Sequence, residues 1–203
     1  MSAERLAVFV RAPVLGAVKT RLASTLGDRS ALAVYEKLLT TLCARLSPLP
    51  SNSVVVHHTP DDGATAFSRC LQPGWMLRPQ GGGPLGERLS RAVGGAFSDG
   101  VERLVIIGSD CPEVQESDIR EAWSALRSQD VVLGPAEDGG YWAIGLRSPR
   151  VEVFHGIAWS SAEVFQQTLD RCRDLQLSVH LLRRLRDIDT EADWNAWRAG
   201  KTA

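Results

Sequence analysis

The stretch "LAVFVRAPVLGAVKTRLA", residues 6–23, joins an apolar run to a loop and then to the start of an amphipathic segment. Its first five residues are typical of a buried strand, and the loop contains Pro13 and Gly16. Lys19 and Arg21 follow, where a helix is expected to begin and where cations oppose the helix dipole. Backbone amides beside two cations suit a polyphosphate, so we expect an anion-binding loop. The G-K-[ST] ending of a Walker A loop is absent.

Outward from this stretch, short apolar runs alternate with longer amphipathic segments. The expected strands are 6–10, 53–58, 74–79, 103–109, 130–135, 141–146 and 177–182, and the expected helices are 29–46, 62–70, 85–98, 117–127, 161–173 and 190–199. This alternation predicts an α/β fold, a three-layer α/β/α sandwich with a mostly parallel, twisted sheet. The stretch 134–160 interrupts the rhythm and is expected to be an antiparallel excursion. Its strand at 141–146 is expected at an edge, where it could pair two chains in a homodimer.

Composition narrows the functional classes. A chain of 203 residues, 44% of them hydrophobic, fits a single domain over 1–203. The net charge of -1 gives no overall field that would favour nucleic acid or an anionic membrane. The first apolar stretch is too short for a signal peptide or a membrane span, so we expect a cytoplasmic protein. Cys43, Cys70, Cys111 and Cys172 form no C-x-x-C pair and are expected to be reduced thiols.

Acidic residues follow two of the expected strands. Asp110 stands directly after the apolar strand at 103–109, and "RDIDTEADW" supplies Asp187 and Asp189. Residues two apart in an extended segment point to the same side, and ligands of α/β sheets bind beyond the carboxyl ends of the strands. We therefore expect these three carboxylates to hold Mg²⁺ or Mn²⁺ against a bound triphosphate. Asp110 could instead cap the helix that follows it, and Asp193 could simply begin the last helix.

Two glycine-rich loops are candidate ligand contacts. "RPQGGGPLGERL" joins a strand to a helix and either approaches a ligand closely or makes a flexible turn. "GPAEDGGYWAIG" either holds an acceptor substrate or is a hairpin with a D-G turn. A tryptophan and a serine beyond the excursion could line the same cleft, although a tryptophan is as often a core residue. The candidate acceptor residues are Glu137, Asp138, Gly139, Gly140, Tyr141, Trp159 and Ser160.

Six motifs in order resemble one bacterial family. They are "RAPVLGAVKTRLA", "QGGGPLGERL", "IIGSDCP", "LGPAEDGGYWAIGL", "IAWSS" and "LRDIDTEADW". Together they resemble glycosyltransferase-like proteins with the GT-A fold, in the nucleotide-diphospho-sugar transferase superfamily, which are related to phospholactate guanylyltransferase. Arg11 stands where the family usually has Lys, and Pro84 where its glycine loop usually has Asp.

The resemblance implies site residues. It implies metal contacts for Asp110, Asp187 and Asp189. It implies triphosphate contacts for Lys19 and Arg21, which with Asp110 form the expected catalytic set. The expected nucleotide contacts are Arg11, Pro13, Gly16, Lys19, Arg21, Gly82 and Gly86.

Three functions remain open. In a Mg²⁺-dependent nucleotidyltransferase, an acceptor phosphate or carboxylate attacks the α-phosphorus of a nucleoside triphosphate and pyrophosphate leaves. A glycosyltransferase would use a nucleotide-diphosphate sugar and a small-molecule acceptor on the same scaffold. "GSDCP" carries one carboxylate where a D-x-D motif would carry two, which favours nucleotidyl transfer. The third possibility is a nucleotide-binding protein without catalysis.

Overall fold

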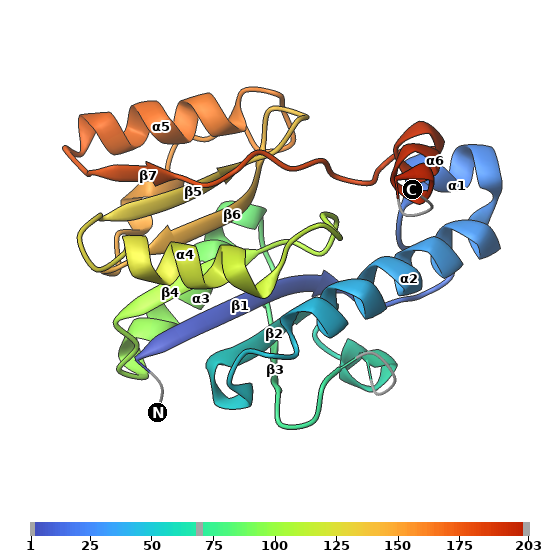
Figure 1. The fold of residues 1–203 in the computed structure, drawn as a ribbon, viewed down its shortest axis with the longest axis horizontal. Coiled ribbons are helices and arrows are strands. Elements are labelled where there is room, and N and C mark those ends of the chain that lie inside the picture. The colour runs from blue at the N-terminus through green and yellow to red at the C-terminus, as the bar shows by residue number, and fades with distance from the viewer. Residues whose placement is uncertain (1–2, 68–70, 201–203) are drawn as a thin grey trace.

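The computed structural model describes residues 3–67 and 71–200 and is built on one twisted sheet (Figure 1). The order of the strands across it is β3-β2-β1-β4-β6-β5-β7. The strands are β1 (Glu4–Arg11), β2 (Val54–Thr59), β3 (Met76–Pro79), β4 (Arg103–Ile107), β5 (Val131–Pro135), β6 (Tyr141–Leu146) and β7 (Val179–Leu181). All neighbouring strands are parallel except where β6 pairs with β4 and β5.

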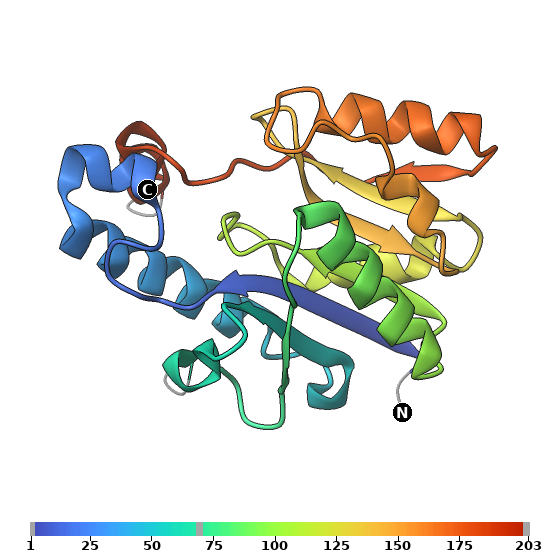
Figure 2. The same ribbon diagram turned by 180° about the vertical axis from the view of Figure 1, so that it is seen from behind.

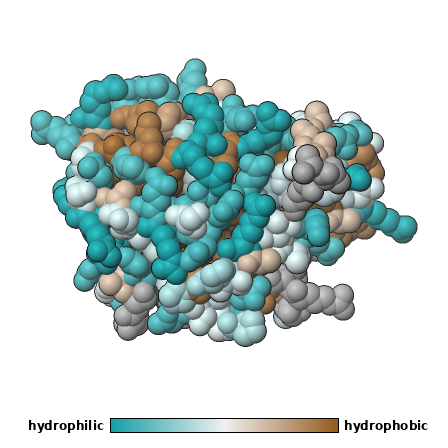
Figure 3. Space-filling view, in the orientation of Figure 1, coloured by the Kyte–Doolittle hydropathy of each residue, from teal (hydrophilic) through white to brown (hydrophobic). Residues whose placement is uncertain are grey.

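Helices cover both faces of the sheet. They are α1 (Thr20–Leu26), α2 (Asp28–Leu46), α3 (Leu85–Ser98), α4 (Glu116–Ala125), α5 (Val164–Asp174) and α6 (Glu191–Ala199). One buried cluster joins α2 and α4 to the sheet, and a second joins α3 and α5 to its other face (Figures 1 and 2). The predicted three-layer α/β/α sandwich is therefore confirmed. The face covered by α2 and α4 is largely hydrophilic, with hydrophobic colour gathered near β7 (Figure 3).

The antiparallel excursion is confirmed, but its position differs from the prediction. β6 lies between β4 and β5 in the middle of the sheet, with Ile144 opposite Ile106 on one side and Leu133 on the other. The expectation of an edge strand at 141–146 was wrong, because a hairpin returns from β5 and inserts beside β4. The edges are β3 and β7, so β6 has no free side with which to pair two chains.

Local chemistry explains where several helices begin and end. Gly27, with φ of 78°, separates α1 from α2; the predicted helix at 29–46 corresponds to α2, and α1 is the helix expected to begin near Lys19 and Arg21. α4 begins one residue earlier than predicted, because Gln115 and Asp118 form a capping box. Thr190 caps α6, at the start of the predicted helix 190–199, and its partner is Asp193. Of the helix expected at 62–70, Gly63–Phe67 is a 3₁₀ turn, and 68–70 lie outside the described residues.

None of the described helices is both long enough and apolar enough to cross a membrane. Within the described residues, Cys43, Cys111 and Cys172 are buried free thiols. Cys70 lies outside the described part of the chain.

The topology brings loops that are distant in sequence to one end of the strands. The carboxyl ends of β1, β4, β5 and β7 lie there, together with the amino end of β6. A backbone hydrogen bond from the Ile188 amide to the Asp110 carbonyl, 2.9 Å long, ties the segment after β7 to the loop after β4. The acidic motifs, 77 residues apart at Asp110 and Asp187 in sequence, are thus neighbours in the fold.

Candidate active site

Lys19 lies between two carboxylates. Its ammonium group is therefore not free to contact a phosphate in this structure. It caps α1 in a left-handed conformation, with φ of 48°, and its side chain is only 4% exposed. Its Nζ atom lies 2.6 Å from Oδ1 of Asp110 and 2.9 Å from Oδ1 of Asp189. Burial would lower the pKa of Lys19, but the two carboxylates outweigh burial and raise it, so the ammonium stays charged.

The predicted convergence of distant acidic residues is present for two of the three. Asp110 and Asp189 are about half-exposed and meet at Lys19. Arg21 lies further out, 77% exposed, with Nη1 3.9 Å from Oδ2 of Asp189. The carboxylates therefore gather around an ammonium that the chain itself supplies.

Asp187 has a different environment. Its Oδ1 accepts a hydrogen bond from the buried Cys111 thiol, with 2.6 Å between the two atoms. Burial raises the pKa of Asp187 to about 6, against the lowering effect of that hydrogen bond. No group of three His, Cys, Asp or Glu side chains within 3–67 and 71–200 forms a ready metal site. Of the three expected metal ligands, Asp110 and Asp189 thus contact Lys19, whereas Asp187 contacts Cys111 instead.

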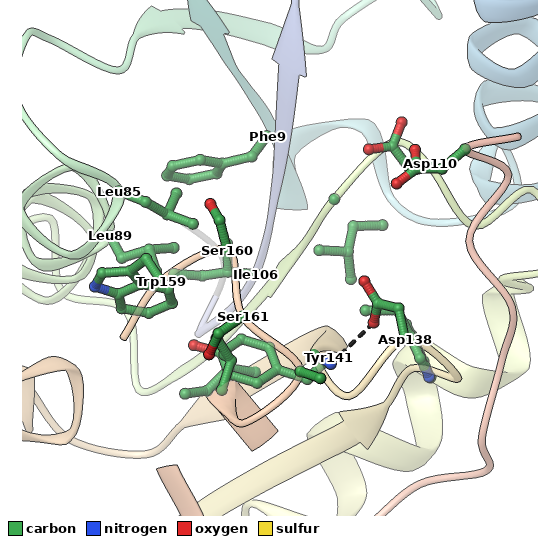
Figure 4. Close-up of a pocket in the computed structure, with 18 of the residues that line it drawn as sticks. Phe9, Leu85, Leu89, Ile106, Asp110, Asp138, Tyr141, Trp159, Ser160 and Ser161 are labelled. Carbon is green, nitrogen blue, oxygen red and sulfur yellow. Dashed lines mark hydrogen bonds between the residues drawn. The ribbon is translucent and has the colours of Figure 1, made fainter. Parts of the chain in front are cut away.

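Two cavities of similar size meet at this pair. The first, which we call the β1 cavity, has a volume of about 520 Å³ and is lined by the end of β1, the loop 17–20, Gln80 and Arg88. The second, the β6 cavity, has a volume of about 510 Å³ and lies between α3, β6 and the segment 159–162 (Figure 4). Both are lined by Phe9, Leu85, Gly108, Asp110, Ser160 and Asp189. The carboxylates therefore stand where contents of the two cavities would touch.

The β1 cavity contains a fixed polar pair that the sequence reasoning missed. The Gln80 Nε2 atom donates to the carbonyls of Val10 and His57, which orients Gln80 Oε1 towards Arg88 Nη1, 2.9 Å away. Arg88 Nε is buried and has no hydrogen-bond partner among the described residues. Arg88 therefore has donor capacity left at the cavity wall. Arg88 belongs to the motif "QGGGPLGERL", but only the start of α3 at Leu85 shows which side chain of that motif faces the cavity.

Several backbone positions near the junction of the two cavities have unusual torsions or lack a side chain. A Cβ atom at Gly108 would meet nothing within 4 Å, so the missing side chain leaves open space between the cavities. Ser160 adopts a φ of 67°, which is unusual for a residue with a side chain. Gly139, with φ of 90°, lies against the backbone of Ala162, where any side chain would collide. Asp138 Oδ1 accepts from the Gly140 amide at 2.9 Å, drawn as a dashed line in Figure 4.

Most, but not all, of the predicted site residues line the two cavities. Those that do are Arg11, Lys19, Arg21, Asp110, Asp138, Gly140, Tyr141, Trp159, Ser160 and Asp189. Those outside both linings are Pro13, Gly16, Gly82, Gly86, Glu137, Gly139 and Asp187.

Specific contacts occupy the residues outside the linings. Glu137 pairs with Arg186 at 2.7 Å, away from the cavities. Gly86 lies behind Trp159, and the carbonyl of Gly82 accepts from Arg91. The prediction that every residue of "EDGGY" faces an acceptor is not supported, because the turn directs Glu137 outward.

Comparison with known proteins identifies relatives. Residues 42–161 match the family described as "Uncharacterized protein conserved in bacteria (DUF2064)". A phosphoenolpyruvate guanylyltransferase of Mycolicibacterium paratuberculosis (strain ATCC BAA-968 / K-10) is 29% identical over 128 residues. That match covers 60% of this chain and 56% of the relative, so it spans little more than half of the relative's length.

Solved structures share the whole fold. A candidate nucleotide-diphospho-sugar transferase from Desulfovibrio desulfuricans G20 superposes with a TM-score of 0.92 at 35% identity, covering 100% of this chain and 90% of the other. Rv0371c of Mycobacterium tuberculosis H37Rv, crystallised in complex with manganese, gives a TM-score of 0.55 at 14% identity, covering 95% and 97%. The second likeness concerns the fold alone. The names of the guanylyltransferase and of the Desulfovibrio protein are those of transferases, as expected from the sequence motifs. The chain belongs to the bacterial family DUF2064 and has the fold of the nucleotide-diphospho-sugar transferases.

Proposed function

We propose that the protein is a divalent-metal-dependent nucleotidyltransferase. It binds a nucleoside triphosphate in the β1 cavity and a small acceptor in the β6 cavity. The observation that carries this proposal is the position of Asp110 and Asp189, side by side on Lys19 at the junction of the two cavities. A reaction that joins two ligands needs its charged groups where the ligands meet.

The donor set at the junction fits a hard divalent cation. Mg²⁺ is commonly held by one or two carboxylates together with substrate phosphates, and Asp110 and Asp189 supply two carboxylates within reach of one ammonium. The manganese complex of Rv0371c makes Mn²⁺ a second choice. When bound there, the cation would stabilise negative charge on the reacting phosphate. Asp187, half-buried beside Cys111, lies two residues before Asp189 and is held by the hydrogen bond from the Cys111 thiol.

Lys19 has two roles in this proposal. In the protein without ligands it neutralises the carboxylate pair, which would otherwise repel. With Asp110 and Asp189 holding a metal, the Lys19 ammonium would be free to contact the triphosphate, and Arg21 would provide a second positive charge near the leaving pyrophosphate. An oxygen of the acceptor forms a bond to the α-phosphorus while the bond from that phosphorus to the bridging oxygen breaks, and pyrophosphate carries away the negative charge.

The first test is whether the protein turns over a nucleoside triphosphate. The protein is incubated with each nucleoside triphosphate, Mg²⁺ or Mn²⁺, inorganic pyrophosphatase and a bacterial metabolite extract, and phosphate release is followed. Because the curated relative is a guanylyltransferase, GTP is the first nucleotide to test. We expect release only when nucleotide, metal and extract are all present. Absence of binding by every nucleoside triphosphate in calorimetry would overturn the proposal.

Variants test the residue assignment. Asp110→Asn is expected to abolish metal-dependent nucleotide binding while shifting the melting temperature by no more than about 5 °C, because the side chain is half-exposed. Asp170→Asn, in α5 and outside the linings of both cavities, is the matched control and should bind as the unaltered protein does. Normal nucleotide binding by Asp110→Asn would remove the metal assignment.

Glycosyl transfer is the second candidate. It is favoured by the description of the Desulfovibrio relative as a nucleotide-diphospho-sugar transferase. Such an enzyme would release a nucleoside diphosphate and no pyrophosphate. Parallel reactions with sugar nucleotides therefore distinguish the two candidates, because glycosyl transfer releases a nucleoside diphosphate and nucleotidyl transfer releases pyrophosphate.

A further inference from the structure

The β6 cavity has two chemically different ends. Figure 4 shows Phe9, Leu85, Leu89 and Trp159 grouped on one side, with Ser160 beside them, and Asp110 and Asp138 on the other side. The apolar end continues along the sheet. Its walls are formed by Phe9, Leu85, Leu89, Ile106, Tyr141 and Trp159. Ser160 and Ser161 also line the cavity, so hydroxyl groups stand beside the apolar side chains.

The apolar wall is packed in advance of any ligand. The Tyr141 and Trp159 rings meet edge to face, with centroids 6.4 Å apart and planes at 78°. Phe154 supports Trp159 from behind at 6.4 Å. The backbone of Gly86 approaches the indole so closely that a Cβ atom would lie 2.9 Å from Nε1. A preformed apolar wall binds apolar surface at little reorganisation cost.

The charges around this cavity disfavour a compact polyanion. Among the described residues that line it, Arg21 is the only cationic side chain, and it is 77% exposed. Asp110, Asp138 and Asp189 line the same cavity. A small acid such as phosphoenolpyruvate carries a carboxylate and a phosphate on three carbons, and such groups bind tightly when several cations or amides meet them. One exposed arginine cannot serve both groups.

We propose that the acceptor carries a single anionic group, a phosphate or carboxylate, on an apolar body formed by a hydrocarbon chain or ring. The anionic group lies at the mouth where the β6 cavity meets the β1 cavity, and the body packs against Trp159 and the neighbouring apolar side chains. This inference rests on the proposed function, because it assumes that the β6 cavity receives the acceptor. It assigns the class of acceptor, which the family and the fold leave open.

A homologous series of alkyl phosphates tests the inference on the unaltered protein. Methyl, butyl and hexyl phosphate share one head group and differ only in apolar length. Each is titrated calorimetrically into protein loaded with Mg²⁺ and the non-reacting analogue α,β-methylene GTP. The affinity is expected to rise about two- to fourfold for each added methylene until the cavity is full. Equal affinity along the series would overturn the inference.

Two further probes separate apolar character from size and charge. Glucose 1-phosphate has a polar body about as large as hexyl phosphate, and phosphoenolpyruvate has a second anionic group. Both are expected to bind at least tenfold more weakly than hexyl phosphate. Equal or tighter binding of either would overturn the inference while leaving nucleotide binding, and with it the proposed function, intact. Failure of every nucleotide analogue to bind would overturn the proposed function and this inference together.

A pair of tryptophan variants locates the effect. Trp159→Ala is expected to weaken hexyl phosphate binding at least tenfold and to leave binding of the GTP analogue unchanged, since Trp159 does not line the β1 cavity. Trp194→Ala, in α6 outside both cavities, is the matched control and should change neither. Melting temperatures verify that both variants are folded. Unchanged hexyl phosphate binding by a folded Trp159→Ala variant would overturn the placement of the apolar body.

Discussion

The ammonium of Lys19 lies 2.6 Å from the carboxylate of Asp110, in the position where sequence motifs alone place a metal ion. The chain thus carries its own counter-ion at the junction of the two cavities. A buried cation held by carboxylates competes with any divalent ion for the same oxygens. This contact can be tested by replacing Lys19.

Replacing Lys19 with Gln should remove its competition with a divalent ion for the carboxylate oxygens of Asp110 and Asp189. The variant is expected to lose about 2 kcal/mol of stability without metal, because Asp110 and Asp189 then repel each other. Added Mg²⁺ or Mn²⁺ should raise its melting temperature more than that of the unaltered protein. Thermal melts across a metal titration measure this, with the exposed Lys37→Gln variant as control. An equal metal response in both proteins would show that Lys19 and the metal do not share ligands.

Gly108→Ala tests whether a ligand occupies the open space beside Gly108, because the substitution should affect ligand binding and not folding. Since a Cβ atom there meets nothing within 4 Å and φ is not left-handed, the fold should be unaffected or slightly more stable, by about 0.5 kcal/mol. The methyl group would project into the space between the cavities, so nucleotide and acceptor should bind at least several-fold more weakly. Gly94→Ala, equally open but in α3, should affect stability alone. Undiminished ligand binding by Gly108→Ala would mean that no ligand crosses the junction.

Arg88 is expected to contact the nucleotide. Its buried Nε has no partner among the described residues, so a nucleotide oxygen or base acceptor would satisfy it. Arg88→Ala should weaken binding of the preferred nucleoside triphosphate about tenfold. Arg88→Lys should recover little, because it keeps the charge but loses the planar fork. The exposed Arg127→Gln variant is the control, and calorimetric binding that Arg88→Ala leaves unchanged would exclude the contact.

His57 should make stability fall in mild acid. Burial, together with Arg78 and Arg5, lowers the pKa of His57 to about 4, against about 6.5 in an unfolded chain. The folded-state pKa is depressed, so this contribution is fully present above pH 6.5. It is lost progressively as the pH falls towards 4, by about 2 kcal/mol at pH 5. Urea unfolding at pH 7.5 and 5 measures the loss, which should shrink in His57→Gln and persist in the exposed His155→Gln. An equal loss in both variants would assign it to other groups.

The fold was largely predictable because its signals are local. Non-alternating runs such as "LVII" mark strands covered on both faces, and the capping residues of α6 stand next to it in sequence. The insertion of β6 beside β4 was not predictable, since strand order depends on which edge a hairpin meets. The approach of Asp110 to Asp189 followed from the rule for carboxyl ends of parallel strands.

The partner of Lys19 could not be predicted from spacing. A motif shows that a cation and a carboxylate share a site, but not whether they contact each other or a ligand between them. The positions of Asp187 and Glu137 were missed for a related reason. Each lies in a short irregular segment, where one backbone torsion decides whether a side chain faces Cys111, Arg186 or a cavity.

Because β6 runs against its neighbours, the turn that precedes it opens onto the cavities, and the loop that follows it lies at the opposite end of the sheet. The hairpin Val131–Leu146 and the segment 159–162 thus form one wall of the β6 cavity, whereas the ends of β1 and β2, the loop 17–20, Gln80 and Arg88 line the β1 cavity. If the two cavities bind acceptor and donor as proposed, substitutions confined to one hairpin would change which acceptor is modified and leave the binding of the nucleotide donor unchanged. Members of one lineage can in this way share a donor and diverge in their products.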